Sequence, residues 1–173
     1  GYEKSVLACR GDRVAMGTMD QKTLTAYHEA GHAVMALLMG RSVQKVSIIP
    51  SQNRLGVCKM QKGRVKQVQD KLEAEMLILL AGMAAEGRRA GKYNIAGASQ
   101  DLHMVEKLAM SRSGNARQAE KLIHKTLDKT QHLLSNKGTW KAVKIIAEEL
   151  LENESISGRA AKHHLSIAQA NKS

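Results

Sequence analysis

Most of the chain places its apolar residues with the period of an α-helix. Apolar residues and alanines from 21 to 39 predict a largely buried helix, and Gly40 follows as a stop signal. From 65 to 83 the apolar positions fall three or four residues apart, which predicts a long helix. The same spacing predicts further helices that open at Ser99 and lie around Leu122 and Trp140, and Ser157 is placed to cap a last one.

A different period appears after the first helix. Residues 43–49 alternate in the manner of a strand and end at Pro50, and residues 55–60 are expected to pair with them. The expected fold class is therefore mainly α with a small β-sheet of two or three strands (α+β). Residues 1–19 are expected to form an N-terminal arm or connector, and residues 20–173 one compact domain. Loops are predicted at 1–19, 51–54, 88–98 and 153–156.

The composition supports a helical core in a single domain. A chain of 173 residues buries roughly 70% of the surface that its unfolded form exposes. Aromatic residues make up only 2%, with no Phe and nine Met, so aliphatic side chains and methionines must fill the core. Cys9 and Cys58 form no C-x-x-C motif, which indicates neither a disulfide scaffold nor a cysteine zinc site and favours a reducing, cytoplasmic compartment.

The chain is strongly basic, with 27 Lys and Arg against 16 Asp and Glu. This excess attracts acidic partners or an anionic membrane surface. Nucleic-acid binding is disfavoured, because the basic residues are spread along the chain without aromatic residues on which bases could stack. The longest apolar run, residues 76–85, is about half as long as a membrane-spanning helix requires, so no transmembrane segment is expected in this chain.

Residues 28–32 (HEAGH) form an H-E-x-x-H motif. On a helix, His28 and His32 share one face and can bind the same metal ion, while Glu29 lies beside the position of a bound water. The competing interpretation is a pair of buried histidines with satisfied hydrogen bonds and a Glu on the surface. A catalytic zinc site needs a third protein ligand, which the residue pattern leaves open. The candidates are His103, His124, His132, His163 and His164 and the carboxylates Asp101, Glu86 and Glu75.

Five segments, in order and spacing, resemble the protease domain of the FtsH family. They are residues 25–34 (TAYHEAGHAV), 46–50 (VSIIP), 55–56 (LG), 81–86 (AGMAAE) and 97–102 (GASQDL). Together they are far more specific than the H-E-x-x-H motif alone, and the resemblance covers most of the chain. Members of that family are membrane-anchored, ATP-driven zinc peptidases. The resemblance therefore implies Zn²⁺ as the cofactor and a zinc-dependent endopeptidase as the activity.

The resemblance also implies the third ligand. The family uses the Asp of a Gly-Ala-Ser-Asn-Asp-like segment, which corresponds to Asp101, with Gln100 in place of the Asn. From the residues alone, Asp101 is better explained as an acidic residue that the helix dipole favours in a first turn. Glu86 corresponds to a family carboxylate near the site, where it either contacts a ligand histidine or caps a helix at the surface. His103 has no family counterpart and is expected to be a surface histidine.

The expected chemistry is hydrolysis of peptide bonds in unfolded or loosely folded proteins. Water bound to zinc has a lowered pKa, and Glu29 takes its proton as general base and later passes that proton to the leaving amine. The polypeptide substrate is expected to add as a strand at the edge of the small sheet, so that a proline within residues 43–49 would impair cleavage. The alternative function is a catalytically idle FtsH-like domain that acts as a protein-interaction or regulatory module.

Two departures from the family pattern concern partners. The 173 residues contain no G-x-x-x-x-G-K-[ST] segment, so an ATPase is expected either elsewhere in the same full-length protein or in trans. Residues 11–17 resemble the segment that joins the protease domain to the ATPase module in that family. Two origins are expected: a protease part trimmed from a longer protein, or an autonomous relative. Membrane association would then depend on a missing region or partner. Between Met110 and Asn115 the chain is shorter than the family, which bears on whether it forms the family's homo-oligomer, a hexameric ring.

Overall fold

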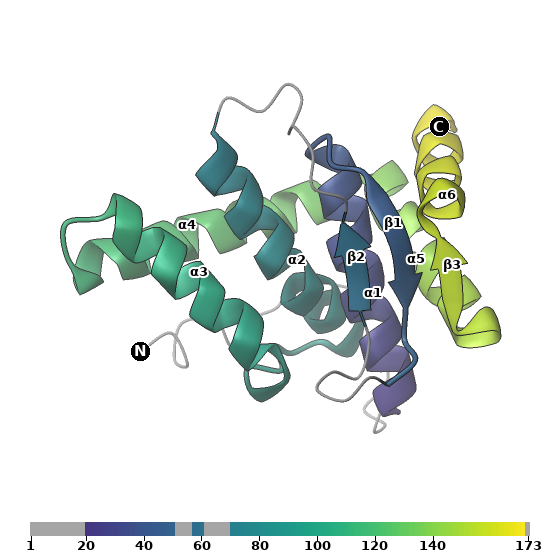
Figure 1. The fold of residues 1–173 in the computed structure, drawn as a ribbon, viewed down its shortest axis with the longest axis horizontal. Coiled ribbons are helices and arrows are strands. Elements are labelled where there is room, and N and C mark those ends of the chain that lie inside the picture. Colours follow the sequence, from purple (N-terminus) through teal and green to yellow (C-terminus); the bar gives the residue numbers. More distant parts are fainter. Residues whose placement is uncertain (1–19, 51–56, 61–69, 172–173) are drawn as a thin grey trace.

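The computed structural model describes residues 20–50, 57–60 and 70–171, and residues 57–60 only through their backbone. The described part is mainly helical with one small sheet, as the sequence predicts (Figure 1). The predicted arm at 1–19 lies outside the described residues, as do residues 55–56 of the second strand and 65–69 of the long helix. The elements are α1 (Gln21–Leu38), β1 (Val43–Ser47), β2 (Val57–Met60), α2 (Lys71–Ala90), the 3-10 turn η1 (Ala96–Ala98), α3 (Ser99–Arg112), α4 (Ala116–Leu134), α5 (Lys137–Asn153), β3 (Ser155–Ser157) and α6 (Gly158–Ala170).

Local signals set the ends of the helices. Ser157 accepts a hydrogen bond from the Ala160 amide at 3.0 Å and caps α6, as predicted. The loop predicted at 88–98 is wrong at its start, because α2 continues to Ala90 and ends at Gly91, where φ is 87°. Residues 88–90 carry no apolar pattern, yet the arginines among them lie over aromatic rings and extend the helix by packing.

The sheet has the strand order β2-β1-β3, and both pairings are antiparallel. β1 and β2 form the predicted pair. The loop predicted at 153–156 is wrong, because residues 155–157 form β3 along the other side of β1. Three residues are too few to show an alternation, so the pairing with β1 creates this strand. Gly158 follows it, where a Cβ would lie 1.5 Å from the Val43 carbonyl oxygen. β1 is therefore the central strand, with neighbours on both sides.

The centre of the molecule is the crossing of α1 and α2. α1 lies between α2, the sheet and α5 (Figure 1), and ten of its eighteen residues are buried. At the crossing, a Cβ on Gly31 would lie 2.5 Å from the Ala81 carbonyl oxygen, so glycine lets the two backbones come this close. Met35, Met76 and Met83 are buried in this core, which has few aromatic rings to fill it.

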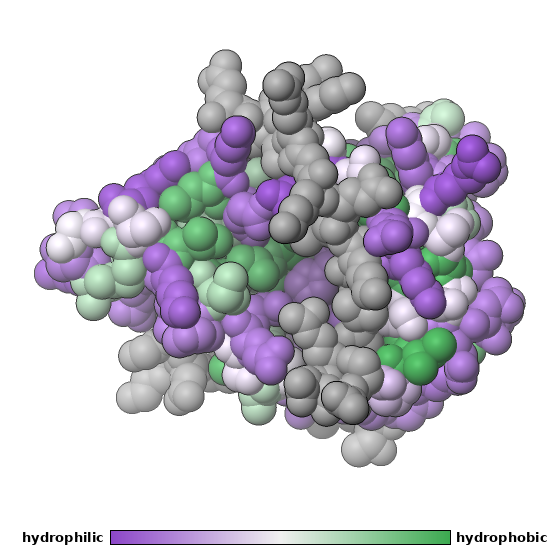
Figure 2. Space-filling model, viewed as in Figure 1, coloured by the Kyte–Doolittle hydropathy of each residue, from purple (hydrophilic) through white to green (hydrophobic). Residues whose placement is uncertain are grey.

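The described residues on the face shown in Figure 2 are largely hydrophilic, with an apolar area where α2, α3 and α4 lie. Met104 and Met110, both on α3, are 49% and 48% exposed. Only three of the fourteen residues of α3 are buried, so this helix is lightly covered by the rest of the described chain. Within the described ranges, we find no helix with the length and apolar character needed to cross a membrane.

Candidate active site

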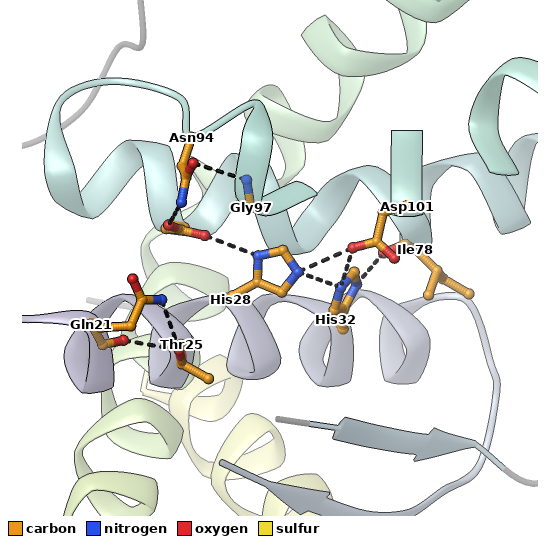
Figure 3. Close-up of polar contacts among 9 residues, drawn as sticks. Gln21, Thr25, His28, His32, Ile78, Asn94, Gly97 and Asp101 are labelled. Carbon is orange, nitrogen blue, oxygen red and sulfur yellow. Dashed lines mark hydrogen bonds and ion pairs between the residues drawn. The ribbon is translucent and has the colours of Figure 1, made fainter. Parts of the chain in front are cut away.

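Three elements meet beside the crossing of α1 and α2. α1 presents His28 and His32, one helical turn apart, toward the first turn of α3, which carries Asp101 (Figure 3). Residues four apart share a helix face, so α1 alone aligns the two imidazole rings. Asp101 reaches the same point because η1 and α3 pack against α2. The site therefore combines one local element and one distant segment of the chain.

The donor atoms of these three side chains converge on one point. Nε2 of His28 and Nε2 of His32 are 3.0 Å apart, and each lies 3.1 Å from Oδ2 of Asp101. Ligands at about 2.0–2.1 Å from a tetrahedral zinc ion are about 3.3 Å from one another. The observed triangle is a slightly contracted form of one face of that tetrahedron. Among the residues that the structure describes, this is the only cluster of three or more His, Cys, Asp or Glu side chains spaced for a metal ion.

Hydrogen bonds at the outer nitrogens determine what the inner nitrogens present. Nδ1 of His32 donates to the Ile78 carbonyl oxygen at 2.7 Å, because a carbonyl can only accept. Nδ1 of His28 donates to Oε2 of Glu86 at 3.0 Å, so Glu86 contacts a candidate ligand histidine. A neutral ring protonated at Nδ1 carries a lone pair at Nε2. Two lone pairs and a carboxylate oxygen then face one another, which is repulsive unless a proton or a cation lies between them.

The electrostatics of the site favour positive charge at this meeting point. Burial opposes a charge on His28, but the carboxylates of Asp101 and Glu86 raise its pKa to about 10. Burial also opposes the charge on Asp101, yet hydrogen bonds from His28 and His32 hold the pKa of its carboxyl well below its usual range. The ring therefore keeps a proton and the carboxyl gives one up. A divalent cation satisfies the same preference and displaces that proton.

Gly82 of α2 leaves room beside the donor atoms. A Cβ at this position would lie 2.4 Å from Nε2 of His32 and 2.7 Å from Nε2 of His28. Both distances are shorter than any normal contact, so a side chain here would fill the space at the inner nitrogens. The three donor side chains and the bare face of Gly82 fit a zinc ion in donor type, spacing and room.

Glu29 follows the first histidine on α1 and is only 7% exposed, unlike the surface Glu of the competing interpretation. None of the other described candidates for the third ligand joins the cluster of His28, His32 and Asp101. Glu75 forms an ion pair with Arg41, and His164 contacts another carboxylate on α5. His103 is exposed, as expected. Of the candidates named from the sequence, the structure brings only Asp101 to the two inner nitrogens.

Some residues of the site have little signal in the sequence. The Ile78 carbonyl has none, because every residue carries one. Gly82 has none either, because its role depends on which helix crosses it. Asn94 donates to Oε1 of Glu86 at 3.2 Å and accepts from the Gly97 amide at 2.9 Å. An Asn three residues before a helical amide is typical of a cap, and that spacing could have indicated Asn94.

Comparison with known proteins places the chain in a family. Residues 15–115, more than half of the chain, match Peptidase family M41. An ATP-dependent zinc metalloprotease FtsH from Rickettsia bellii is 36% identical over 111 residues, covering 57% of this chain and 17% of that protein. The Haemophilus influenzae protein of that name is 38% identical over 102 residues, which cover 56% of this chain and 16% of the relative. That of Neorickettsia risticii is 34% identical over 125 residues, which cover 67% of this chain and 20% of the relative.

The matched segments cover a fifth or less of each of these relatives. The range matched by the family nevertheless contains the H-E-x-x-H motif, Glu86, Asn94 and Asp101. The resemblance to the FtsH protease domain is thereby confirmed, and this chain belongs to Peptidase family M41.

Proposed function

We propose that this chain is a zinc-dependent endopeptidase domain that cleaves unfolded or loosely folded polypeptides. The observation that carries the proposal is the convergence of two imidazole nitrogens and one carboxylate oxygen, 3.0–3.1 Å apart, beside the helix that bears Glu29. Three protein ligands leave one position of a tetrahedral ion to water, as catalytic zinc sites do. Membership of a peptidase family, and relatives named zinc metalloproteases, support the same metal and activity.

Each residue of the site has a distinct task in this proposal. When bound, zinc supplies a Lewis acid that polarises the scissile carbonyl and makes water more acidic. Glu29 is the general base, which takes a proton from the attacking water and returns it to the leaving amine. Glu86 and the Ile78 carbonyl hold the outer nitrogens of the two rings, which keeps both Nε2 atoms turned inward.

The polypeptide substrate is proposed to lie extended along the outer edge of β2. β1 is paired on both sides over residues 45–47, so a substrate strand cannot add beside them, and a proline there would disrupt the sheet itself. β2 contacts α1, the helix of the two histidines, whereas β3 lies toward α5 and α6 (Figure 1). Backbone hydrogen bonds to an edge strand tolerate many side chains, which suits a peptidase of loosely folded proteins.

An ATPase is proposed as the partner that unfolds larger substrates. The relatives are named ATP-dependent, and the matched segments cover a fifth or less of their length. We therefore assign the ATP-dependent step to residues outside the match, either in the same full-length protein or in a second chain. Assembly into a homo-oligomer stays a prediction from the resemblance to FtsH.

Zinc content and cleavage, measured on the same preparations, test this function. Glu29→Gln should keep its zinc and lose roughly 10²–10⁴-fold of peptide cleavage, which is the usual contribution of a general base. Asp101→Ala should lose both the bound zinc and peptide cleavage, because only two protein ligands remain. His103→Ala is the matched control, since His103 is exposed on the same helix as Asp101.

Three outcomes would contradict parts of the proposal. Equal cleavage by the wild type and Glu29→Gln would remove the peptidase assignment. Zinc binding without cleavage of casein or peptides would favour the idle, protein-interacting module instead. Unchanged cleavage of a peptide N-methylated along its backbone would exclude the added strand at β2, because methylation removes the donors that the strand needs.

A further inference from the structure

The side chain of Asn94 bridges two parts of the chain that hold different metal ligands. Asn94 lies between α2 and η1, and its amide nitrogen donates to Oε1 of Glu86 at 3.2 Å (Figure 3). Its amide oxygen accepts from the backbone of Gly97 at 2.9 Å. Glu86 in turn uses its second oxygen to hold Nδ1 of His28 at 3.0 Å. One side-chain amide thus connects the carboxylate behind a ligand histidine to the turn that leads into α3.

This connection fixes the carboxylate behind His28. Glu86 is only 4% exposed, so each of its oxygens needs a hydrogen-bond donor inside the protein. His28 supplies the donor for one oxygen and Asn94 supplies the donor for the other. Without the amide of Asn94, the carboxylate could rotate, and the ring of His28 would lose the partner that keeps its Nε2 turned inward.

The same amide also fixes the direction in which α3 begins. The backbone carbonyl of Asn94 accepts from the Ala98 amide at 3.2 Å, so both the side chain and the backbone of Asn94 accept hydrogen bonds from η1. Asp101 lies in the first turn of α3, directly after η1. A Cβ on Gly97 would lie 2.4 Å from the amide nitrogen of Asn94, so the amide packs against the bare face of that glycine. The position of the third ligand therefore depends on this contact.

We propose that Asn94 is a positioning residue of the metal centre, which sets the orientation of His28 through Glu86 and the position of Asp101 through Gly97. This inference rests on the proposed zinc site. It goes beyond that site because Asn94 touches neither the ligand atoms nor the substrate. Partners that orient metal ligands from behind contribute about tenfold to a hundredfold in metal affinity.

The test measures Zn²⁺ affinity by competition with a chelator, and the absorption spectrum of the Co²⁺ form, for the purified chain. Asn94→Ala should bind Zn²⁺ about tenfold more weakly and shift the Co²⁺ bands. Asn115→Ala is the matched control, because Asn115 caps α4 with an equivalent bond of 2.9 Å from the Gln118 amide. This control should bind Zn²⁺ as the wild type does.

A double-mutant cycle separates positioning from a general loss of stability. If Asn94 acts through Glu86, then Asn94→Ala should cost clearly less affinity in a Glu86→Ala background than in the wild type. Asn94→Asp keeps the acceptor for the Gly97 amide and replaces the donor to Glu86 by a carboxylate oxygen, which repels Glu86. It therefore tests the link to Glu86 if Asn94→Ala folds poorly. It should also bind Zn²⁺ more weakly.

The outcomes distinguish this inference from the proposed function. Wild-type affinity in Asn94→Ala and Asn94→Asp, or fully additive losses in the cycle, would overturn the role of Asn94 and leave the zinc peptidase intact. A wild-type chain that binds neither Zn²⁺ nor Co²⁺ would overturn the proposed metal centre and the role of Asn94 with it.

Discussion

The two helices that carry the candidate metal ligands are held in the molecule in different ways. α1 carries both histidines and runs through the interior, with ten of its eighteen residues buried. α3 carries Asp101 and lies on the outside, with only three of its fourteen residues buried (Figure 1). Half of the candidate site is therefore part of the core, and the other half is attached to it by a few contacts.

α3 packs against α2 and α4 through one narrow buried stripe, and polar contacts hold the turn before it and its last turn. Leu102, Val105 and Ala109 form the stripe that reaches the core. The Asn94 amide holds the turn before the helix, and Arg112 at its last turn pairs with Asp70, the cap of α2. Local stability follows the number of buried apolar contacts, so α1 should be the rigid side of the site and α3 the adjustable side.

The largest effect is expected for Gly82→Ala on α2, because its new Cβ meets the two histidines of the rigid side. The new Cβ would lie 2.4–2.7 Å from both inner nitrogens, which belong to side chains that can swing away. The helices can then stay packed while the donor triangle is destroyed. We expect zinc content near zero and no measurable cleavage, with a circular dichroism spectrum and unfolding midpoint close to those of the metal-free wild type. Zinc analysis and thermal unfolding check this.

Gly31→Ala provides the contrasting variant on α1. Its Cβ would meet the Ala81 carbonyl at 2.5 Å and the Ala85 Cβ at 2.6 Å, and neither atom can swing away. Overpacking of this kind costs about 1–3 kcal/mol, although the higher helix propensity of Ala returns up to about 1 kcal/mol. A Gly82→Ala protein that kept its zinc, or a Gly31→Ala protein as stable as the wild type, would contradict the packing described here.

The same contrast explains what the sequence could predict. His28, Glu29 and His32 were identifiable because the helical period is a local property, readable from the flanking apolar residues. Asp101 was not, because it shares no local pattern with the histidines and competes with several other carboxylates and histidines. Only the resemblance to FtsH selected it, and the structure then brought it within 3.1 Å of both rings.

The helices and strands, like the site residues, could be predicted from the sequence only where a local pattern determines them. Long helices and the paired strands β1 and β2 could be predicted from period and turn residues. β3 could not, because three residues between two helices form a strand only where β1 leaves an edge open. The roles of Gly82 and Asn94 depend on which helix or turn lies opposite, and a sequence does not state this.

A second, smaller effect is expected in hydrogen exchange. In metal-free protein, backbone amides in the middle of α3 should exchange at least about tenfold faster than those in the middle of α1, because α3 opens without disrupting the core. Zinc should slow exchange in α3 more than in α1, since the ion ties Asp101 to the buried histidines. Mass spectrometry of exchanged peptides measures both. Asp101→Ala is the control, in which zinc should add no protection to α3; equal rates in the two helices would refute the contrast.

The smallest effect concerns the contact at the far end of α3. The Arg112 guanidinium beside Asp70, together with the Glu73 amide, lowers the pKa of Asp70 to about 2 from 3.8. A lowered folded-state pKa stabilises the protein above the unfolded pKa, so this contribution is complete near pH 5 and disappears as the pH falls from 3.8 toward 2. Both side chains are at least a third exposed, and water therefore screens the pair.

Arg112→Gln should accordingly change the folding equilibrium constant only about twofold to fivefold at pH 5, measured by urea unfolding. The difference from the wild type should shrink as the pH falls toward 2, because Asp70 becomes increasingly protonated and the ion pair is lost. Arg117→Gln, an exposed arginine on α4, controls for the loss of one positive charge. A deficit that stayed constant down to pH 2 would show that Arg112 acts through packing of its alkyl chain and not through its pairing with Asp70. Since the pair lies at the opposite end of α3 from Asp101, its loss should weaken zinc binding less than the loss of the Asn94 amide.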